Sequence, residues 1–234
     1  MKTLAIITAR GGSKRIPRKN IKPFLGKPII QYSIEAALQS NCFDEVMVST
    51  DDKEIAELSV KNGAVVPFMR SEKTSNDFAT TSEVILEVLS SYKLKGIEFE
   101  HACCIYPTAP FVTSEKLNTV FKMLKESDAK SVIPVTSFSF PILRSCKIEN
   151  NKLLMNWPEH TNTRSQDLPR AYHDSGQFYF IRVDSFMLEK KVFTDNTLGF
   201  IVPETEVQDI DNEEDWKIAE IKYSFLLQKK ENHV

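Results

Sequence analysis

The stretch that decides the fold is residues 4–20, which read LAIITARGGSKRIPRKN. Its first six residues are apolar or β-branched, which predicts a short strand buried on both faces. The run stops at Arg10; six basic residues lie between Arg10 and Lys22, and no acidic residue precedes Glu35. A buried strand that ends in a basic loop predicts positive charge at the carboxyl edge of a sheet, where open α/β sheets bind ligands.

The loop itself, residues 10–20, has the composition of a phosphate site. Gly11 and Gly12 let the backbone approach a ligand closely and offer N–H donors to it. Lysine and arginine add point charges and bidentate forks for phosphate. The alternative is a solvated basic loop, which is the usual interpretation of an isolated basic run, but the buried strand and the paired glycines favour a triphosphate site. The predicted nucleotide-binding residues of the loop are Arg10, Gly11, Gly12, Ser13, Lys14, Lys19 and Asn20.

Length and charge limit the other classes of function. A chain of 234 residues suits one α/β domain, residues 1–234, and its net charge of −2 makes the basic loop a local feature. That balance favours a small anionic ligand over nucleic acid, which needs a basic face across a whole domain. No apolar run approaches eighteen residues, so we expect no membrane partner and a cytoplasmic location. The four cysteines lack metal-ligand spacing and are expected to be reduced.

Segments with helical and strand periodicity alternate after the loop. Such alternation predicts a Rossmann-like, doubly wound and mostly parallel sheet with helices on both faces. Helices are expected at residues 29–38, from about 52 to 61, from 82 to about 92, and from 114 to about 126; strands are expected at 45–50, 64–67, 101–106 and 131–135.

The alternation breaks at Thr136. From about residue 136 to 175 the chain is rich in loops and prolines, with short strands expected at 143–148 and 152–156, so we interpret it as an insertion. Phe138, Phe140 and Trp157 are hard to bury in so short an excursion, which favours a partner surface. Strands at 177–181 and 199–202 resume the sheet, and a last helix is expected from 213 to about 228.

Two carboxylates precede that last helix. Asp209 and Asp211 are two residues apart, so on an extended segment both face one side. Paired carboxylates beside a triphosphate form a typical Mg²⁺ site, because Mg²⁺ takes few protein ligands and completes its shell with phosphates and water. The alternative is that one of them caps the helix.

The basic loop, as ARGGSKRIPRKN over residues 9–20, resembles the signature of the acylneuraminate cytidylyltransferases, the CMP-sialic acid synthetases and their relatives. The resemblance implies a fold of the nucleotide-diphospho-sugar transferase type, a CTP substrate, and Mg²⁺, which Mn²⁺ can replace, on Asp209 and Asp211. It also implies that the insertion reaches across the interface of a homodimer. The catalytic residues implied are Arg10, Lys14, Lys19, Asp209 and Asp211.

A second nucleotide-binding segment follows from the same resemblance. Arg70 and the polar loop after it match the family's arginine loop, and Thr80, Thr81 or Ser82 would contact cytosine or ribose. An ordinary helix cap is an equally good interpretation of any one of these hydroxyls. Asp51 and Asp52 end a strand at the same edge, where they would hold ribose or metal, or cap the next helix.

The acceptor-sugar segments depart from the sialic acid pattern. Tyr106 stands in the turn YPTAP, residues 106–110, where sialic acid enzymes commonly have Gln. Residues 164–169 keep the family's Arg-x-Gln-Asp-Leu-Pro, but HDSGQFY at 173–179 replaces its Asn-Gly-Ala. This version resembles the pseudaminic acid cytidylyltransferases. The implied sugar-binding residues are Tyr106, Arg144, Arg164, Gln166, His173 and Gln177, with Arg144 and Arg164 on the sugar carboxylate.

We therefore expect transfer of CMP from CTP to the anomeric hydroxyl of a nonulosonic acid, with release of pyrophosphate and with pseudaminic acid favoured. One alternative is the same reaction on sialic or legionaminic acid. The other is a non-catalytic relative that binds a nucleotide or sugar as a sensor, which has no need of the metal ligands.

Overall fold

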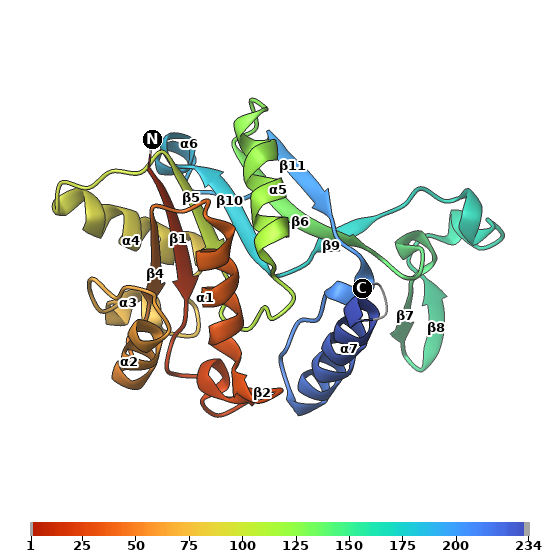
Figure 1. The fold of residues 1–234 in the computed structure, drawn as a ribbon. Coiled ribbons are helices and arrows are strands. Elements are labelled where there is room, and N and C mark those ends of the chain that lie inside the picture. Colours follow the sequence, from red (N-terminus) through yellow and green to blue (C-terminus); the bar gives the residue numbers. More distant parts are fainter. Residues whose placement is uncertain (1, 232–234) are drawn as a thin grey trace.

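The chain, described over residues 2–231 in a computed structural model, is built on a seven-stranded mixed sheet (Figure 1). β1 runs parallel to β4 and β5, and β6 runs parallel to β11. β10 is antiparallel to both of its neighbours, β5 and β6, so the expected mostly parallel sheet has one reversed central strand. The strand order is β11 (Thr197–Ile201), β6 (Ser131–Ser137), β10 (Phe178–Arg182), β5 (His101–Ile105), β1 (Thr3–Thr8) and β4 (Glu45–Ser49), with β9 (Tyr172–Asp174) paired to β6.

Different helices cover the two faces of the sheet (Figure 1). Ala5 and Ile7 of β1 share a core with α1 (Ile29–Ser40) and α5 (Ser114–Lys125). Leu4 and Ile6 point the other way and pack with α4 (Thr81–Leu94) and α6 (Val183–Glu189). Successive strand residues face opposite sides, so a strand covered on both sides must be apolar throughout. The predicted α/β architecture is confirmed.

One predicted strand is wrong. Residues 64–67 make only a single parallel bridge, Met47 to Val65, instead of a strand. Pro67 follows closely and has no N–H to donate, so the pairing cannot continue. The neighbouring α2 (Lys53–Lys61) and the short α3 (Glu72–Ser75) flank this connection, and β2 (Pro23–Phe24) pairs with β3 (Lys27–Pro28) before α1.

A separate small core fastens the last helix, α7 (Glu213–Glu231), to the basic loop. Ile16 from the loop is fully buried, and Ile210 is 1% exposed. Both have charged residues close by in sequence, yet they pack in the same cluster with Trp216 of α7. This shared core brings the loop and the Asp209–Asp211 segment together although they are about 190 residues apart in sequence.

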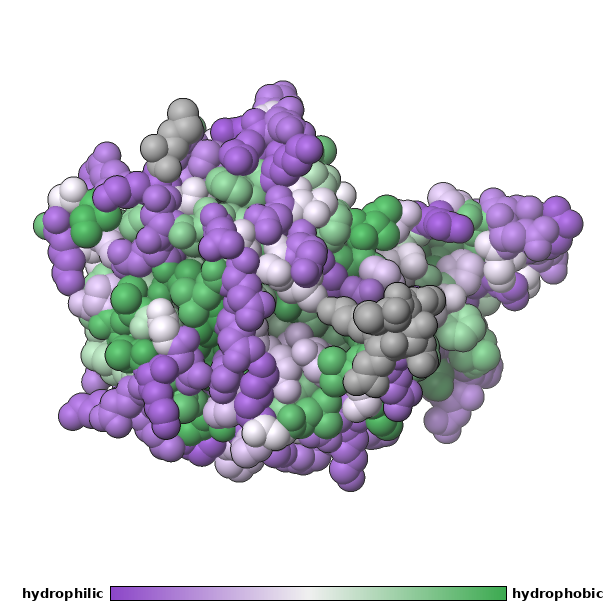
Figure 2. Space-filling view, viewed as in Figure 1, coloured by the Kyte–Doolittle hydropathy of each residue, from purple (hydrophilic) through white to green (hydrophobic). Residues whose placement is uncertain are grey.

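The chain leaves the sheet after β6 as an arm, residues 138–171, and returns at β9 (Figure 1). The arm holds a hairpin of β7 (Cys146–Glu149) and β8 (Lys152–Met155), whose turn places Asn150 and Asn151 at φ 52° and 60°, a conformation that asparagine tolerates. Three short 3₁₀ turns complete it: Ile142–Arg144, Pro158–His160 and Ser165–Asp167. Figure 2 shows apolar surface over the hairpin.

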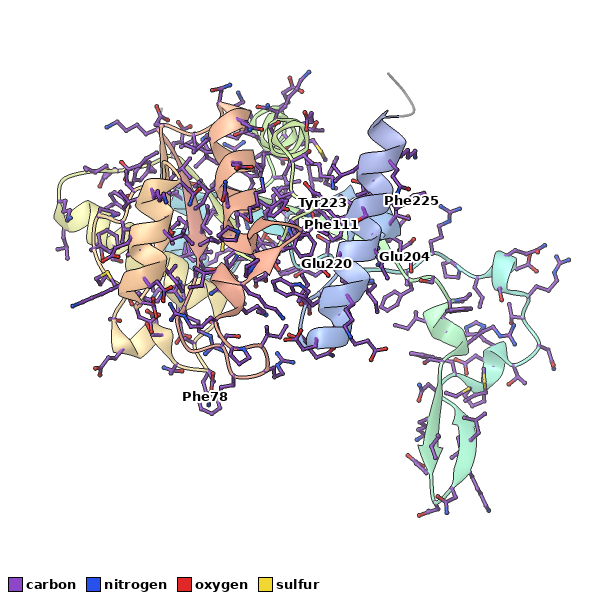
Figure 3. All side chains as sticks on the ribbon, turned by 60° about the horizontal axis from the view of Figure 1, so that its bottom comes forward. Phe78, Phe111, Glu204, Glu220, Tyr223 and Phe225 are labelled. Carbon is purple, nitrogen blue, oxygen red and sulfur yellow. The ribbon has the colours of Figure 1, made fainter. Side chains whose placement is uncertain are left out.

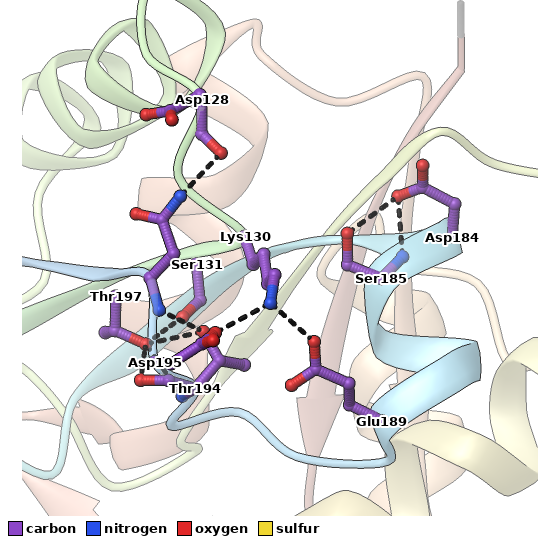
Figure 4. Close-up of polar contacts among 10 residues, drawn as sticks. Asp128, Lys130, Ser131, Asp184, Ser185, Glu189, Thr194, Asp195 and Thr197 are labelled. Carbon is purple, nitrogen blue, oxygen red and sulfur yellow. Dashed lines mark hydrogen bonds and ion pairs between the residues drawn. The ribbon is translucent and has the colours of Figure 1, made fainter.

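The opposite end of the sheet carries a structural polar cluster (Figure 4). Lys130 binds Asp195 at 2.6 Å and Glu189 at 2.8 Å, just before β6 begins. Ser131 and Thr197, the first residues of β6 and β11, share a 2.7 Å hydrogen bond. This cluster joins α6 to the amino ends of two strands, so the carboxyl edge is left for ligands. No helix within residues 2–231 is both long and apolar enough to cross a membrane.

Candidate active site

The basic loop is held open by the end of β4. Asp51 accepts a hydrogen bond from the Gly11 N–H at 2.8 Å. A Cβ on Gly11 would lie 2.8 Å from the Asp52 carboxylate, so the loop needs glycine there. Asp52 caps α2 through Ile55 and pairs with Arg18, which stands at φ 55°. Of the roles predicted for Asp52, helix capping is therefore the one that its contacts support. Arg18 stabilises the loop by pairing with Asp52.

Around this loop lies a cavity of about 650 Å³, which we call the cationic cavity. Four basic side chains and two carboxylates reach it, so its walls carry excess positive charge. Asn20 is buried and donates to the Arg10 carbonyl at 2.8 Å, which fixes the loop's two ends. The lining residues are Thr8, Arg10, Ser13, Lys14, Arg15, Lys19, Asn20, Asp77, Tyr106, Pro107, Thr108 and Asp211.

Asp77 is an internal anion in that cavity. Arg10 Nη1 lies 2.6 Å from its carboxylate, and Lys14 contacts the other oxygen. These two cations hold the pKa of Asp77 below its usual range, Lys14 contributing more. A ligand phosphate would meet the same two side chains, so Asp77 competes for that position.

Lys19 joins the cationic loop to the acidic segment. Its Nζ donates to the Ile210 carbonyl at 2.7 Å, between Asp209 and Asp211. Burial lowers the pKa of Lys19, and the two carboxylates oppose that effect. The hydrogen bond to Ile210 therefore fixes the Lys19 side chain without the help of a ligand.

Neither aspartate caps α7. Asn212 is the cap, because its Oδ1 accepts the N–H groups of Glu214 at 2.8 Å and Asp215 at 3.0 Å. Asp211 pairs with Arg15 at 2.7 Å in the cationic cavity. Asp209 is open to solvent, yet the protein atoms around it and the charge of Asp211 raise its pKa. The two carboxylates thus repel one another, and a divalent cation would relieve that repulsion.

This donor set fits a magnesium ion. Asp209 and Asp211 offer two carboxylates, and the described side chains, those of residues 2–229, contain no cluster of three or more His, Cys, Asp or Glu suited to a metal. Mg²⁺ typically takes one or two protein carboxylates and obtains its other oxygens from substrate phosphates and water.

A second cavity of about 610 Å³, the acidic cavity, lies beside the first and shares Tyr106 with it. The Tyr106 hydroxyl and Thr81 Oγ1 are 2.8 Å apart, and its ring meets the Tyr179 ring edge-on, with centroids 5.5 Å apart. Tyr179 in turn donates to Asp174 at 2.6 Å. The other lining residues are Thr136, His173, Asp174, Ser175, Gly176, Tyr179, Glu204, Val207, Gln208, Asp209 and Lys222.

The acidic cavity holds several residues that sequence reasoning missed. Thr136 and Ser175 are 1% and 3% exposed, and neither hydroxyl has a hydrogen-bond partner among the residues described. Buried polar groups are usually satisfied, so these two hydroxyls are exceptions in the wall behind the acidic cavity. Ser175 lies in the segment that departs from the sialic acid pattern, which was a usable signal; Thr136 and Lys222 carry no such signal.

Six predicted site residues outside the arm line neither cavity: Gly11, Gly12, Arg70, Thr80, Thr81 and Gln177. Arg70 is buried and donates to Ser49 Oγ at 3.0 Å, and burial lowers its pKa. Thr80 forms a capping box with Glu83, so the cap interpretation describes this hydroxyl. Gln177 is buried and donates to the Glu206 carbonyl at 2.5 Å. Their ligand roles stay predictions.

The predicted sugar ligands of the arm stand apart from both cavities. Arg164 pairs with Asp167 at 2.7 Å, and Arg144 has a 3.4 Å contact with Ser165. Arg144, Arg164 and Gln166 all lie on the arm, which projects away from the sheet (Figure 3). None of them lines either cavity of its own chain.

The sequence of this chain is similar to a family model and to several known proteins. A family model described as cytidylyltransferase matches residues 4–217. A pseudaminic acid cytidylyltransferase of Campylobacter jejuni subsp. jejuni serotype O:2 is 42% identical over 224 residues, which are 95% of this chain and 97% of that protein. A CMP-N,N'-diacetyllegionaminic acid synthase of Legionella pneumophila is 31% identical over 223 residues, 94% and 95% of the two chains.

Among solved structures, a CMP:2-keto-3-deoxy-manno-octonic acid synthetase complexed with CTP superposes with a TM-score of 0.71. The match covers 98% of this chain and all of the other at 18% identity. This likeness shows the fold that the two proteins share.

Proposed function

The chain belongs to the cytidylyltransferase family, and we propose that its sugar acceptor is pseudaminic acid. It is a CTP-using nucleotidyltransferase that transfers CMP to a nonulosonic acid. The observation that carries the specific acceptor is the 42% identity to pseudaminic acid enzymes over almost the whole of both chains, against 31% for the legionaminic acid enzyme.

The two cavities suit the two substrates. The triphosphate of CTP would occupy the cationic cavity, where Arg10, Lys14 and Lys19 neutralise it and the departing pyrophosphate. The sugar would occupy the acidic cavity across Tyr106. Its anomeric oxygen attacks the α-phosphorus in line; that O–P bond forms while the bond to the bridging oxygen of the β-phosphate breaks, and the hydroxyl proton is released. Positioning and charge neutralisation supply most of the rate in such a reaction.

We further propose that Asp209 and Asp211 hold Mg²⁺, with Mn²⁺ as a substitute. When bound, the ion would neutralise charge on the phosphate oxygens. Asp211 lines the cationic cavity and Asp209 the acidic cavity, so the pair stands where the two substrates would meet. A non-catalytic sensor, the alternative function, would not need these metal ligands.

We propose a homodimer formed through the arm. Phe140, Ile148 and Leu153 are 84%, 75% and 71% exposed in the single chain, an unusual apolar surface for a free arm. A second copy would also bring Arg144 and Arg164 to a cavity that they cannot line in their own chain. Light scattering at micromolar concentration should give twice the single-chain mass; Leu153→Glu should lower it, and Lys152→Glu serves as the matched control. A single-chain mass for the wild type contradicts the proposal.

The location proposed is the cytoplasm. All four cysteines are free, with Cys103 and Cys104 buried, which fits a reducing compartment.

Competition between sugars tests the acceptor. With CTP, pseudaminic acid should be converted at least about tenfold faster than N-acetylneuraminic acid, a ratio that needs only about 1.4 kcal/mol of transition-state discrimination. Tyr106→Gln should lower this ratio of the two conversion rates. Tyr106→Phe, which keeps the aromatic ring, is the control. Equal or reversed conversion defeats the pseudaminic acid assignment, and no pyrophosphate release with any sugar supports the sensor alternative.

A further inference from the structure

The acidic cavity has an unexpected charge balance for an acidic sugar. Three carboxylates line it, from Asp174, Glu204 and Asp209, whereas Lys222 is its only lysine or arginine in the part of the chain described. A nonulosonic acid carries its carboxylate on the anomeric carbon, next to the attacking hydroxyl. An anion that enters such a cavity needs a cation close to it, because an unpaired charge is expensive to desolvate.

Lys222 is held in place without a carboxylate partner. Its Nζ donates to the Val207 carbonyl at 2.7 Å and, more weakly, to the Glu204 carbonyl at 3.3 Å. Among the side chains described, those of residues 2–229, no carboxylate forms an ion pair with Lys222. An ammonium has three N–H donors, so one remains for a ligand.

The fold fixes the direction in which Lys222 points. Tyr223, the next residue, faces Phe111 on the body side of α7, and Glu204 lies on the side toward the arm (Figure 3). Tyr223 and Trp216 both pack against the small core under α7. The helix cannot rotate without breaking that core, so the Lys222 ammonium stays at Glu204 and Val207.

We propose that Lys222 binds the carboxylate of the acceptor sugar and thereby places its anomeric hydroxyl toward Asp209 and the cationic cavity. This inference rests on the proposed function, since it assumes an acidic sugar. Arg144 and Arg164 belong to the arm and could add to this site only from a second copy, so Lys222 is the contribution of the chain itself.

The test compares the sugar acid with its carboxamide, which keeps the anomeric hydroxyl and loses the charge. Lys222→Met should raise KM for the acid about tenfold or more, leave KM for CTP unchanged, and abolish the preference for acid over amide. Lys222→Arg should restore part of that preference. Lys217→Met, on the exposed side of the same helix, is the matched control and should behave as wild type.

Calorimetry with CMP present gives a readout that needs no turnover. The wild type should bind the acid more tightly than the amide, and Lys222→Met should bind both equally; a thermal melt checks that each variant is folded. An unchanged acid-to-amide ratio in active Lys222→Met overturns this inference and leaves the proposed function intact. A wild type that binds the acid through Lys222 but releases no pyrophosphate overturns only the function, and a wild type that binds no acid overturns both.

Discussion

Replacing Asp209 or Asp211 by Asn should separate catalysis from folding. Asn212 caps α7, so neither aspartate is needed for the helix. The pKa of Asp209 is raised by its protein surroundings and by Asp211. A carboxyl whose pKa is higher in the folded chain than in the unfolded chain lowers stability above that folded pKa, and Asn removes this effect. Asp209→Asn should therefore melt at the wild-type temperature or slightly higher at pH 7.

Activity should change in the opposite direction. Each substitution removes one of the two carboxylates proposed to hold Mg²⁺, so charge on the phosphates is less well neutralised. The expected fall in kcat is on the order of 10²–10⁴, equivalent to about 2.7–5.4 kcal/mol of transition-state stabilisation. Asp211→Asn also frees Arg15, so its melting temperature is the less informative of the two.

The assay is pyrophosphate release at limiting Mg²⁺, with Mn²⁺ titrated by calorimetry as a measure of metal binding that does not depend on turnover. Glu214→Gln removes an exposed carboxylate from the first turn of α7 and serves as the matched control. Wild-type activity should disappear in EDTA and return with Mg²⁺. Full activity and unchanged Mn²⁺ affinity in both Asn variants would refute the metal assignment.

Three further outcomes are expected. Lys19→Ala should lower kcat/KM for CTP by about 10² with little change in melting temperature, whereas near-normal activity would mean that the basic loop is merely solvated. Asp77→Asn should tighten calorimetric binding of CTP by about two- to fivefold at low salt, because it releases Arg10 and Lys14, and the gain should shrink in high salt; an unchanged Kd speaks against competition. Burial lowers the pKa of His101, so this residue should not reduce the free energy of unfolding above about pH 6.5 and should reduce it as the pH falls below that value. Urea titrations at several pH values should show a smaller decrease in this free energy for His101→Phe than for the wild type. The same dependence on pH in both proteins contradicts this prediction.

The sequence predicted the strand and the loop at the start of the chain well because the signals for them are local. The strand before Arg10 is continuously apolar, and a strand with a core on each face has to be so. The paired glycines follow at once; Gly11 is required because a Cβ would collide with Asp52, whereas the predicted approach of the backbone to a ligand stays a prediction. Helix periodicity likewise located α1, α4, α5 and α7 to within a few residues.

Direction and long-range contact were beyond the same signals. A strand buried on both faces has the same composition whether it runs parallel or antiparallel, so the reversal of β10 left no trace in the sequence. Ile16 and Ile210 look like isolated apolar residues in polar segments, and only the fold shows that they share a core. From the sequence alone, Asp209, Asp211 and Asn212 are equally good candidates for the cap, because Asp and Asn both cap well.

The two cavities differ in predictability because they are assembled differently. Most of the cationic cavity comes from one segment near the start of the chain, so composition alone marks it. The acidic cavity draws one or two residues each from β6, β9, β10 and α7, and four from the segment of residues 204–209 before α7. Lys222 is one lysine among several on a helix that is mostly solvated, and nothing in its neighbours in sequence distinguishes it. The residues proposed to hold the acceptor are thus the least visible in the sequence, since each is fixed by contacts distant along the chain, and a substitution there should weaken sugar binding without touching the nucleotide loop.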